Sequence, residues 1–306
     1  MEKKPIIIDT DPGIDDAVAL AIALHSEKLD VRHITTVHGN VSLDKVTVNA
    51  LKLLEFFEKE VPVSAGATRP LLRKPINASR VHGESGLDGF TFPEPDHRLL
   101  TNEHAVNVMH KEIMESEEKI TLVPIGPLTN IALLVRLYPE VCDRIEEIVL
   151  MGGSASHGNA SPMAEFNILA DPEAAKIVFG SEIPIVMLGL DIGKHARIFP
   201  EESSQIKDMN ETGNMVYHLL THYRGDVMDL GLTMYDSTAI GYLLKPEMYL
   251  TVDTFVDVET HGSLTAGCTV VDLNNRLGKR PNAKVALDLD EKAFKKWLMK
   301  GLENCR

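Results

Sequence analysis

The chain has few of the residues that mark secreted, membrane or nucleic-acid-binding proteins. Its three cysteines are an odd number spread far apart, and no CxxC pair occurs, so a disulfide framework is not expected. Aromatic residues make up only 5%, too few for platforms on which single-stranded nucleic acid stacks. No apolar run approaches the roughly 18 residues of a membrane span, and the run 5–8 is too short for a signal peptide. We therefore expect a soluble, cytoplasmic protein with no membrane partner.

Basic residues are also in the minority. Lys and Arg number 31 against 45 Asp and Glu, which gives a net charge of −14. A chain this negative repels a phosphate backbone, so we expect no nucleic-acid polymer as a partner. Phosphate-cradling motifs are missing as well, because neither a Walker sequence nor G-x-G-x-x-G occurs. The acidity instead directs attention to divalent-cation chemistry.

What the chain does contain is an alternation of short apolar runs and longer helical patterns. The runs that predict strands are 5–9, 30–37, 61–65, 119–125, 146–151 and 183–190. The segments that predict helices are 14–26, 42–58, 102–116 (capped by Asn102), 127–137 and 171–180. Runs apolar on both faces and separated by helices are typical of a covered parallel sheet. We predict an α/β fold, a single domain over 1–306, with a mostly parallel central sheet and helices on both faces.

Two regions depart from this alternation. The last third predicts a helix over 200–224, strand-like segments at 249–259, 268–273 and 283–289, and a final helix over 290–302. The stretch 66–101 has no clear pattern and includes Gly83, Gly86 and Gly89. A loop of this length in a compact domain is usually functional or mobile, so we expect one of these properties here.

The segment 6–16 holds the densest group of chemically active side chains. An apolar strand ends at Asp9, a Pro-Gly turn follows, and a helix is expected from Asp15, so Asp9, Asp11, Asp15 and Asp16 fall within eight residues. In open α/β sheets, ligands bind at the carboxyl ends of strands. Two like charges 4 Å apart repel by roughly 4 kcal/mol at an effective dielectric of 20, so a cation or protonation must relieve them. Hard oxygen ligands favour Ca²⁺ or Mg²⁺, although each residue alone is also typical of a turn or a helix start.

A metal-dependent phosphatase is an alternative for the same segment. Asp9-Thr10-Asp11 matches the start of the pattern D-x-D-x-[TV], in which the first aspartate is a nucleophile, so Asp9 or Asp11 would carry that chemistry. The position that should be Thr or Val is Gly13, and the two later carboxylates are surplus to that mechanism. The pattern therefore disfavours a phosphatase.

Further blocks downstream complete a family pattern. The blocks are Asp9-Thr10-Asp11-Pro12-Gly13-Ile14-Asp15-Asp16-Ala17, Thr35-Thr36-Val37-His38-Gly39-Asn40, His82-Gly83-Glu84-Ser85-Gly86, Gly126-Pro127-Leu128-Thr129-Asn130, Met151-Gly152-Gly153 and Ala164-Glu165-Phe166-Asn167. In this order they resemble the inosine-uridine-preferring nucleoside hydrolases, calcium-dependent N-ribohydrolases, from about residue 5 to the final helix. The chain looks closest to bacterial members that accept purine and pyrimidine ribonucleosides. The resemblance implies a modified α/β fold, hydrolysis of ribonucleosides to ribose and free base, and a homodimer or homotetramer.

The resemblance also implies residue roles. One eight-coordinate Ca²⁺ would be held by Asp11, Asp16, the backbone carbonyl of Ile125 and Asp236, and Asp11 would be the general base on a calcium-bound water. The residues implied to bind the sugar are Asp15, Asn40, Asn159, Glu165 and Asn167, with Phe166 beneath the ring. These roles suit an oxocarbenium-like transition state, which anions and an activated water stabilise. Taken singly, Glu165 and the three asparagines are typical of caps and turns.

One position departs from the family pattern. Purine-cleaving members carry a histidine that protonates the leaving base, and this chain has Tyr235 there. The reference pKa of tyrosine is about 10, against about 6.5 for histidine, so Tyr235 is the poorer acid, but it can donate a hydrogen bond to the base or stack on it. His82 is a second candidate for this contact, and Tyr223 with Arg224 precedes a segment, 225–231, that can close over the base. A non-catalytic nucleoside-binding protein is the alternative if the change removed turnover; the retained aspartates disfavour it.

Overall fold

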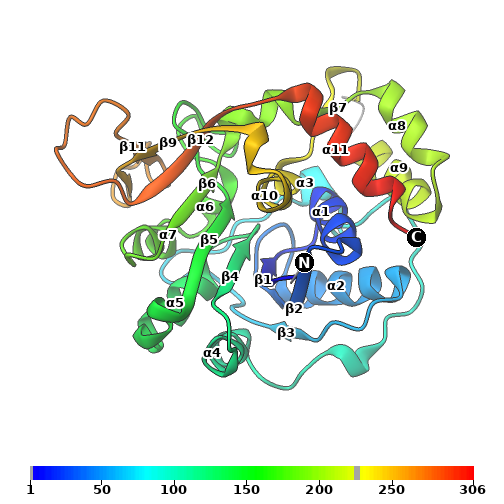
Figure 1. The fold of residues 1–306 in the computed structure, drawn as a ribbon, viewed down its shortest axis with the longest axis horizontal. Helices are drawn as coiled ribbons and strands as arrows, with labels where there is room; N and C mark the ends of the chain where they lie inside the picture. The colour runs from blue at the N-terminus through cyan, green and yellow to red at the C-terminus, as the bar shows by residue number, and fades with distance from the viewer. Residues whose placement is uncertain (1–2, 224–227) are drawn as a thin grey trace.

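The computed structural model describes residues 3–223 and 228–306, and its centre is an eight-stranded sheet (Figure 1). In spatial order the strands are β3 (Val63–Ala65), β2 (Leu29–Thr36), β1 (Lys4–Thr10), β4 (Ile120–Pro124), β5 (Ile145–Met151), β6 (Ile185–Leu188), β12 (Ala283–Leu289) and β9 (Tyr249–Thr254). Every neighbouring pair is parallel except β12 with β9. The predicted α/β fold with a mostly parallel sheet is therefore confirmed.

Helices cover both faces of the sheet, and each face has its own hydrophobic core (Figure 1). One core includes α1 (Ile14–His25), α2 (Leu43–Phe57), α9 (Glu211–His222), α10 (Tyr235–Leu244) and α11 (Glu291–Glu303). The other includes α4 (Ala105–Glu115), α5 (Thr129–Leu137) and α7 (Pro172–Phe179). Because side chains alternate along a strand, Ile6 and Ile8 of β1 enter the first core and Ile7 enters the second. Burial stabilises each isoleucine by roughly 1.5–3 kcal/mol, so a strand apolar on both faces is pinned in the middle layer.

The strand order decides where a site can form. The chain moves outward from β1 to β2 and β3, then returns to β4 on the other side of β1 and continues to β5 and β6. The order therefore reverses between β1 and β4, and the segments that leave these two strands diverge. Ligands of such sheets bind at this switch point, beyond the carboxyl ends of the strands. Asp11 directly follows β1 and Ile125 directly follows β4, so both predicted residues lie there.

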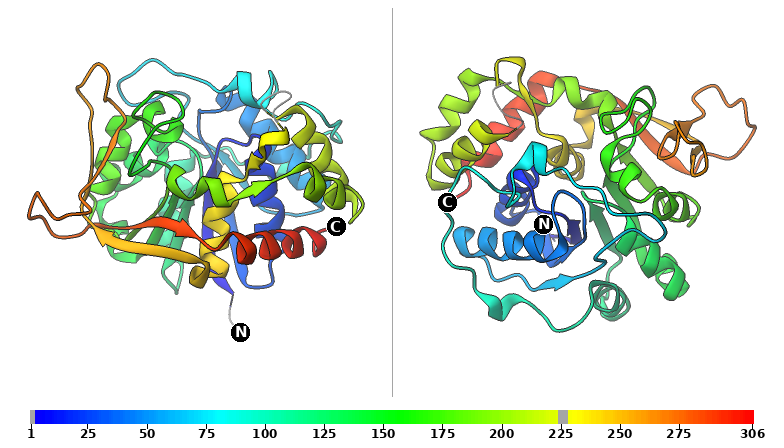
Figure 2. Two further views of the ribbon diagram at one scale, coloured as in Figure 1. Left: turned by 90° about the horizontal axis from the view of Figure 1, so that it is seen from above. Right: turned by 180° about the vertical axis from the view of Figure 1, so that it is seen from behind.

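The remaining elements are short or lie outside the central sheet. They are α3 (Ser79–His82), α6 (Phe166–Ala170), α8 (Pro200–Lys207), β7 (Arg197–Ile198), β8 (Leu232–Thr233), β10 (Val256–Val258), β11 (Thr269–Val271) and the 3₁₀ turns η1 (His97–Leu99), η2 (Pro139–Arg144), η3 (Leu190–His195), η4 (Met228–Leu230) and η5 (Pro246–Met248). β10 and β11 form an antiparallel pair. With their connecting loops they make a projection, residues 255–282, which we call the arm (Figure 2).

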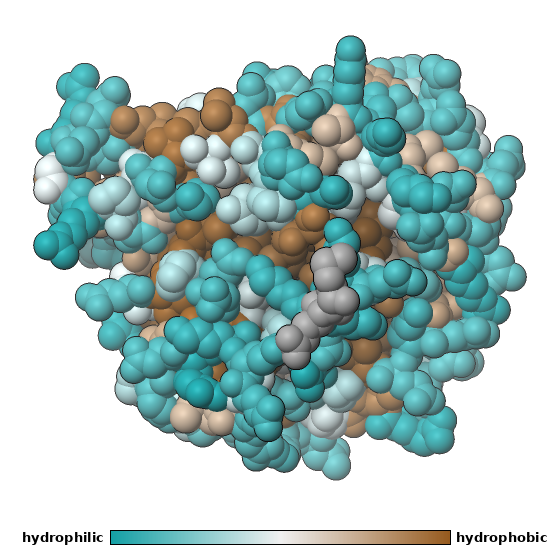
Figure 3. Space-filling view, viewed as in Figure 1, coloured by the Kyte–Doolittle hydropathy of each residue, from teal (hydrophilic) through white to brown (hydrophobic). Residues whose placement is uncertain are grey.

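The surface is hydrophilic over most of the face drawn in Figure 3, and apolar side chains gather where the arm joins the body. β9 and the arm also carry exposed leucines, among them Leu250, Leu264 and Leu277. Within residues 3–223 and 228–306, no helix combines the length and the apolar character that a membrane crossing requires.

Two helix predictions are wrong in detail. The described part of the segment 200–224 forms two helices rather than one, because Asn210 is extended and its side chain accepts a hydrogen bond from Gly213 N–H (2.7 Å), which starts α9. Asn102 does not cap α4, because the helix begins later and His104 Nδ1 accepts the capping hydrogen bond. In both cases the helix was recognised, but the residue that starts it was not.

The other differences concern short or fully buried elements. The strand-like segment 249–259 is divided between the central sheet and the arm. The stretch 66–101 contains the single-turn helix α3, and α6 is only five residues long, too short for a periodic pattern. α10 buries Asp236 to Gly241 in one run, so it lacks the polar stripe by which a surface helix is recognised.

Candidate active site

Asp11 lies at the switch point, in a space that two glycines leave open. Its carboxylate Oδ2 accepts a hydrogen bond from Asn40 N–H (2.7 Å), and the Asn40 side chain donates to the Asp11 carbonyl (3.0 Å). A Cβ at Gly39 would overlap this carboxylate, and one at Gly126 would lie 2.6 Å from Asp11 Oδ1. The two motif glycines are therefore required for the close approach of the chain to Asp11. Asn40 serves this contact rather than capping α2.

Asp15, Asp16 and Asp236 form a compact cluster of buried carboxylates. One oxygen from each lies within 4.8 Å of the others, a spacing that can hold a metal ion. Asp15 and Asp16 belong to the first turn of α1, and Asp236 belongs to the first turn of α10. Thr10 Oγ1 (2.5 Å) and Gly13 N–H (2.9 Å) donate hydrogen bonds to Asp16. The first turns of two packed helices thus bring together carboxylates that are 220 positions apart in the numbering (236 − 16).

Burial shifts the protonation of these groups. The pKa values of Asp11 and Asp236 are raised well above the usual range, first because burial penalises the charged form and then because neighbouring carboxylates repel it. Burial also raises the pKa of Asp16, whose carboxylate lies in the same cluster as that of Asp236. A divalent cation would replace these protons and relieve the repulsion. The donor set consists of oxygen atoms alone, which fits a hard cation such as Ca²⁺ or Mg²⁺.

Asn167 and Glu165 connect α6 to the ends of two strands. The Asn167 side-chain amide donates to the Ile125 carbonyl (3.0 Å) and to the Met151 carbonyl (3.1 Å). Glu165 caps α6 by accepting hydrogen bonds from Asn167 N–H (2.9 Å) and Ile168 N–H (3.1 Å). Burial raises the pKa of Glu165 to about 7. Glu165 therefore does act as a helix cap, and it also lies at the pocket rather than in solvent.

His82, Tyr223 and Tyr235 lie at the same site from three different elements. His82 Nδ1 accepts a hydrogen bond from Ile14 N–H (3.1 Å), so its proton is on Nε2. The same Nδ1 is 4.0 Å from Asp15 Oδ1, and the rings of His82 and Tyr223 are 5.3 Å apart between centroids. Tyr235 is the first residue of α10. Arg224 and Gly225, named with Tyr223 from the sequence, lie outside the described residues.

These groups surround one pocket of about 730 Å³, a size typical of small-molecule sites, which span roughly 300–1,000 Å³. Its lining includes the predicted residues Asp11, Asp15, Asn40, His82, Ile125, Asn159, Glu165, Phe166, Asn167, Tyr223, Tyr235 and Asp236. Asp16 lies buried behind this lining, in contact with Asn40, whose side chain donates to it (3.2 Å). The Asn159 side chain accepts a hydrogen bond from Phe166 N–H (3.0 Å), which closes the loop that the sequence suggested as a turn.

The sequence reasoning missed part of the lining. The missed residues are Ile76 to Val81, Met151, Ala160 and Leu169. Met151 was part of a recognised motif, and 76–81 directly precedes the His82-Gly83 motif inside the stretch without a pattern. Nearness to these two motifs was the available signal. Ala160 and Leu169 are likewise close to residues named from the sequence, Asn159 and Asn167, but their apolar side chains gave no signal of their own.

Asp9 is separate from the pocket. Its Oδ1 accepts hydrogen bonds from Thr35 Oγ1 (2.6 Å) and the Asn130 side chain (2.8 Å), and no hydrogen-bond partner is found for Oδ2 among the described residues. Burial raises its pKa to about 7. A phosphatase that used Asp9 as a nucleophile would need this carboxylate at a substrate site, and it is 1% exposed and does not belong to the lining.

Comparison with known proteins agrees with this geometry. Residues 6–296 match the family model described as inosine-uridine preferring nucleoside hydrolase. The non-specific ribonucleoside hydrolase RihC of Escherichia fergusonii is 49% identical over 294 residues, which is 96% of each chain, and RihC of Shigella boydii serotype 4 is 50% identical over the same shares. Among solved structures, a plant nucleoside hydrolase, PpNRh1, superposes with a TM-score of 0.91 at 32% identity, covering 99% of each chain. The chain thus belongs to the inosine-uridine preferring nucleoside hydrolase family.

Proposed function

We propose that this protein hydrolyses the N-glycosidic bond of purine and pyrimidine ribonucleosides to give ribose and free base. The observation that carries the proposal is the cluster of buried carboxylates, Asp11, Asp15, Asp16 and Asp236, in and directly behind the lining of one nucleoside-sized pocket. Membership of the family supports the reaction class. The relatives named non-specific ribonucleoside hydrolases support a broad choice of base.

We assign the metal as Ca²⁺, held by Asp11, Asp16, Asp236 and the backbone carbonyl of Ile125. The fit rests on oxygen donors whose raised pKa values reflect burial and mutual repulsion. The Ile125 carbonyl has a second lone pair besides the one that accepts from Asn167. When bound, Ca²⁺ would lower the pKa of a water molecule and orient the vicinal 2′- and 3′-hydroxyls of ribose. Asp15, which lies in the same cluster, is assigned to those hydroxyls and is the closest alternative ligand.

The other polar groups of the pocket bind and orient the sugar. Asp11 takes the proton from the attacking water as general base, because its carboxylate lies at the pocket and is held from one side by Asn40. Asn40, Asn159, Glu165 and Asn167 hold the sugar hydroxyls, and Phe166 lies beneath the ring. Several anions around the sugar stabilise the oxocarbenium-like transition state, and fixed contacts keep water and sugar aligned.

Two residues are candidates for contact with the leaving base. His82 donates through Nε2, because Nδ1 is occupied by the hydrogen bond from Ile14. Tyr235 occupies the position where purine-cleaving members have a histidine, and it donates a hydrogen bond or stacks on the base. Tyr223, packed on the His82 ring, belongs to the same part of the pocket.

The test is ribose release from inosine, uridine and cytidine by the purified protein, with added Ca²⁺ and after chelation. We expect calcium-dependent release from all three, and the ratio among them measures the effect of Tyr235. Release of phosphate from a phosphomonoester instead would support the phosphatase. Binding of nucleosides without release of ribose would support the non-catalytic alternative.

We also propose that residues 1–306 form a single domain, since the central sheet uses strands from Lys4 to Leu289. A homodimer or homotetramer is supported by the exposed leucines on β9 and the arm. A cytoplasmic location is supported by the composition. Sedimentation equilibrium tests the oligomeric state.

A further inference from the structure

The segment 76–82 forms one wall of the pocket, and it has little regular structure of its own. Each of its residues belongs to the lining, and only the last four form the single turn α3. The residues before α3, 66–78, contain neither helix nor strand. A segment with few internal hydrogen bonds opens easily unless contacts from outside hold it. Two such contacts lie within the segment, from Ala78 N–H to the Asn40 carbonyl (2.9 Å) and from Ile14 N–H to His82, and a further group of contacts lies immediately before it.

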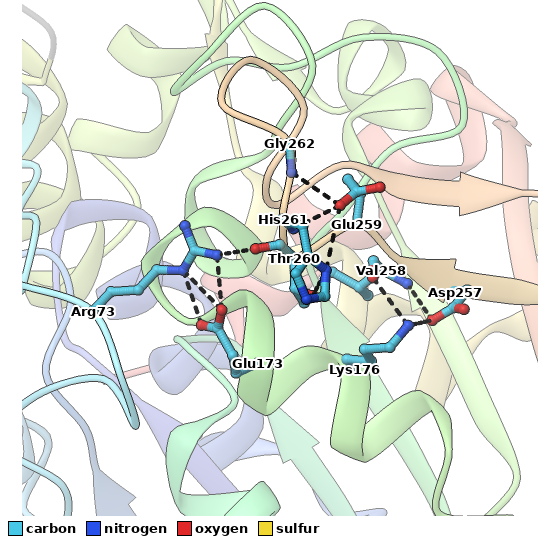
Figure 4. Close-up of polar contacts among 9 residues, drawn as sticks. All are labelled: Arg73, Glu173, Lys176, Asp257, Val258, Glu259, Thr260, His261 and Gly262. Carbon is cyan, nitrogen blue, oxygen red and sulfur yellow. Dashed lines mark hydrogen bonds and ion pairs between the residues drawn. The ribbon is translucent and has the colours of Figure 1, made fainter.

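Arg73 lies three residues before this wall and joins it to two other parts of the molecule (Figure 4). Its guanidinium donates to both carboxylate oxygens of Glu173, with Nη2–Oε1 at 2.7 Å and Nε–Oε2 at 2.9 Å. Nη2 also donates to the Thr260 carbonyl (2.5 Å). Glu173 belongs to the first turn of α7, and Thr260 belongs to the arm. Because a bidentate pair sets direction as well as distance, Arg73 is held in one orientation.

Both partners of Arg73 are attached to a second part of the pocket lining, which α6 provides. α7 follows α6 after one residue, and α6 carries the proposed sugar-binding residues Phe166 and Asn167. The arm also contacts the loop that leads from β5 to α6, where Thr269 Oγ1 donates to the Ser154 carbonyl (2.6 Å). A Cβ at Gly267 would lie 2.9 Å from Leu169, which shows how closely the arm packs on α6. Arg73 therefore lies where three segments that build the pocket meet.

Two neighbours strengthen this link. Leu71 N–H donates to Asp171 Oδ2 (2.9 Å), and Asp171 is the N-cap of α7. Pro75 lies between Arg73 and Ile76, and its ring fixes φ, so less freedom remains between the anchor and the wall. Holding Arg73 consequently restricts where the wall can begin.

We propose that Arg73 is a positioning residue, which holds the wall 76–82 against α7 and the arm and thereby sets the affinity for the nucleoside. This inference rests on the proposed hydrolase function. Arg73 does not belong to the pocket lining, so it acts through the wall. The carboxylates beneath the pocket have their own contacts, from Thr10, Gly13 and Asn40, and do not depend on Arg73. Loss of Arg73 is therefore expected to raise KM and to leave kcat and the metal site nearly unchanged.

Figure 4 also shows a second ion pair, which provides a matched control. Lys176 lies on the same helix, α7, and its Nζ donates to Asp257 Oδ1 of the arm (2.5 Å). This ion pair is partly exposed and links the same helix to the same arm, but it connects nothing to the wall 76–82. Lys176→Ala therefore removes a comparable pair without removing the proposed anchor.

The experiment compares Arg73→Ala, Arg73→Lys and Lys176→Ala with the unmodified protein. Steady-state kinetics with inosine and uridine give KM and kcat, and amide hydrogen exchange reports on the wall, where His82 and Gly83 N–H donate to the Ala78 and Ser79 carbonyls. For Arg73→Ala we expect KM to rise about tenfold, kcat to stay within about twofold, and exchange of these amides to quicken by about tenfold. Arg73→Lys keeps the positive charge but loses the bidentate hydrogen bonds of the guanidinium, so it gives a smaller rise in KM. Lys176→Ala leaves all three quantities unchanged.

Two results would overturn the proposal. In the first, KM and exchange of the wall stay unchanged in both Arg73 variants. In the second, kcat and the melting temperature fall at constant KM, which is the result of a merely structural role. Should Arg73→Ala fail to fold, Arg73→Lys decides on the same criteria. If the unmodified protein releases no ribose, the proposed function fails, and the exchange measurement alone still tests whether Arg73 holds the wall.

Discussion

The carboxylates at the base of the pocket and the wall 76–82 are neighbours in space, but different contacts hold them. The base, Asp11, Asp15, Asp16 and Asp236, is buried and is held by hydrogen bonds from residues next to it, such as Thr10 and Asn40. The wall is irregular, and the proposed anchor at Arg73 lies outside it. In the proposed function the carboxylates carry the chemistry, which tolerates little displacement, whereas the wall belongs to the lining that would enclose the nucleoside.

The two regions also differ in their effect on the stability of the folded protein. Buried carboxylates with raised pKa values destabilise the metal-free chain, because burial and mutual repulsion oppose their ionised form. The wall costs little, since much of it is exposed and its few outside contacts, such as Ala78 N–H to the Asn40 carbonyl (2.9 Å) and Ile14 N–H to His82, bury no charge. Changes at the four carboxylates should therefore alter turnover, metal binding and stability together. Changes at the wall should mainly alter the affinity for the nucleoside and the preference for one nucleobase over another.

The largest effect is expected from Asp11→Ala. Loss of the general base and of one metal ligand should lower kcat by about a thousandfold or more, while some binding of nucleoside or ribose survives on the remaining sugar contacts. Ribose release and calorimetric titration with ribose measure the two quantities. Asp9→Asn, two residues away but outside the pocket, is the matched control and should keep most of the activity. Near-normal turnover of Asp11→Ala would contradict its assignment as general base.

Removal of the metal is the next test of the carboxylate cluster. Chelation should lower turnover by about a hundredfold or more, and added Ca²⁺ should restore it. Because the raised pKa values of Asp11, Asp16 and Asp236 mean that binding displaces protons, calcium affinity should increase with pH. The rise in melting temperature on adding Ca²⁺ should accordingly be larger at about pH 8 than at about pH 5. Equal rises at both values would show that the cluster does not bind the ion.

Asp9→Asn should change stability without changing the pocket. The Asp9 pKa is raised from 3.8 to about 7, so between these values the unfolded chain releases a proton that the folded chain keeps. The free energy of unfolding of the metal-free protein therefore falls as pH rises from about 4 to about 7, and Asn removes this contribution. Relative to the unmodified protein, Asp9→Asn should gain roughly 2–4 kcal/mol over that range. Urea unfolding in chelator at several pH values measures it, and a constant difference would refute the raised pKa.

The smallest effect is expected from Tyr235→His, at the side of the pocket assigned to the base. A histidine offers a better proton source near neutral pH, so inosine cleavage should rise by about tenfold more than uridine cleavage. The ratio of the two kcat/KM values is the measurement, and Tyr235→Phe is the control that keeps the ring without the hydroxyl. An equal effect on both substrates would remove Tyr235 from the leaving-group step.

Much of the fold was predictable because its signals are local. Strands such as β1 are apolar on both faces, and β1 to β6 were recognised from that property. The helices α6 and α10 were not recognised from the sequence. α6 is only five residues long, and α10 is buried along most of its length. The start of α4 depended on His104, an uncommon cap that the preference for Asn, Asp, Ser and Thr does not anticipate.

The candidate site divides in the same way. The residues of the carboxylate cluster were predictable from motifs, since the proposed chemistry requires particular side chains. Ile76 to Val81 were not, because a wall can be built from many sequences. Arg73 and Glu173 gave no signal either, as they are 100 residues apart and meet only after folding.

The sequence by itself determined the class of fold and the family, because alternating apolar runs and closely spaced motif residues act over a few positions. The family resemblance already placed Asp236 with Asp16. Only the tertiary structure decided that Asp9 lies outside the pocket lining and that Arg73 connects the wall to α7 and the arm. These contacts depend on which elements the sheet brings side by side. That choice results from packing two cores against one sheet, a property of the whole chain rather than of any segment.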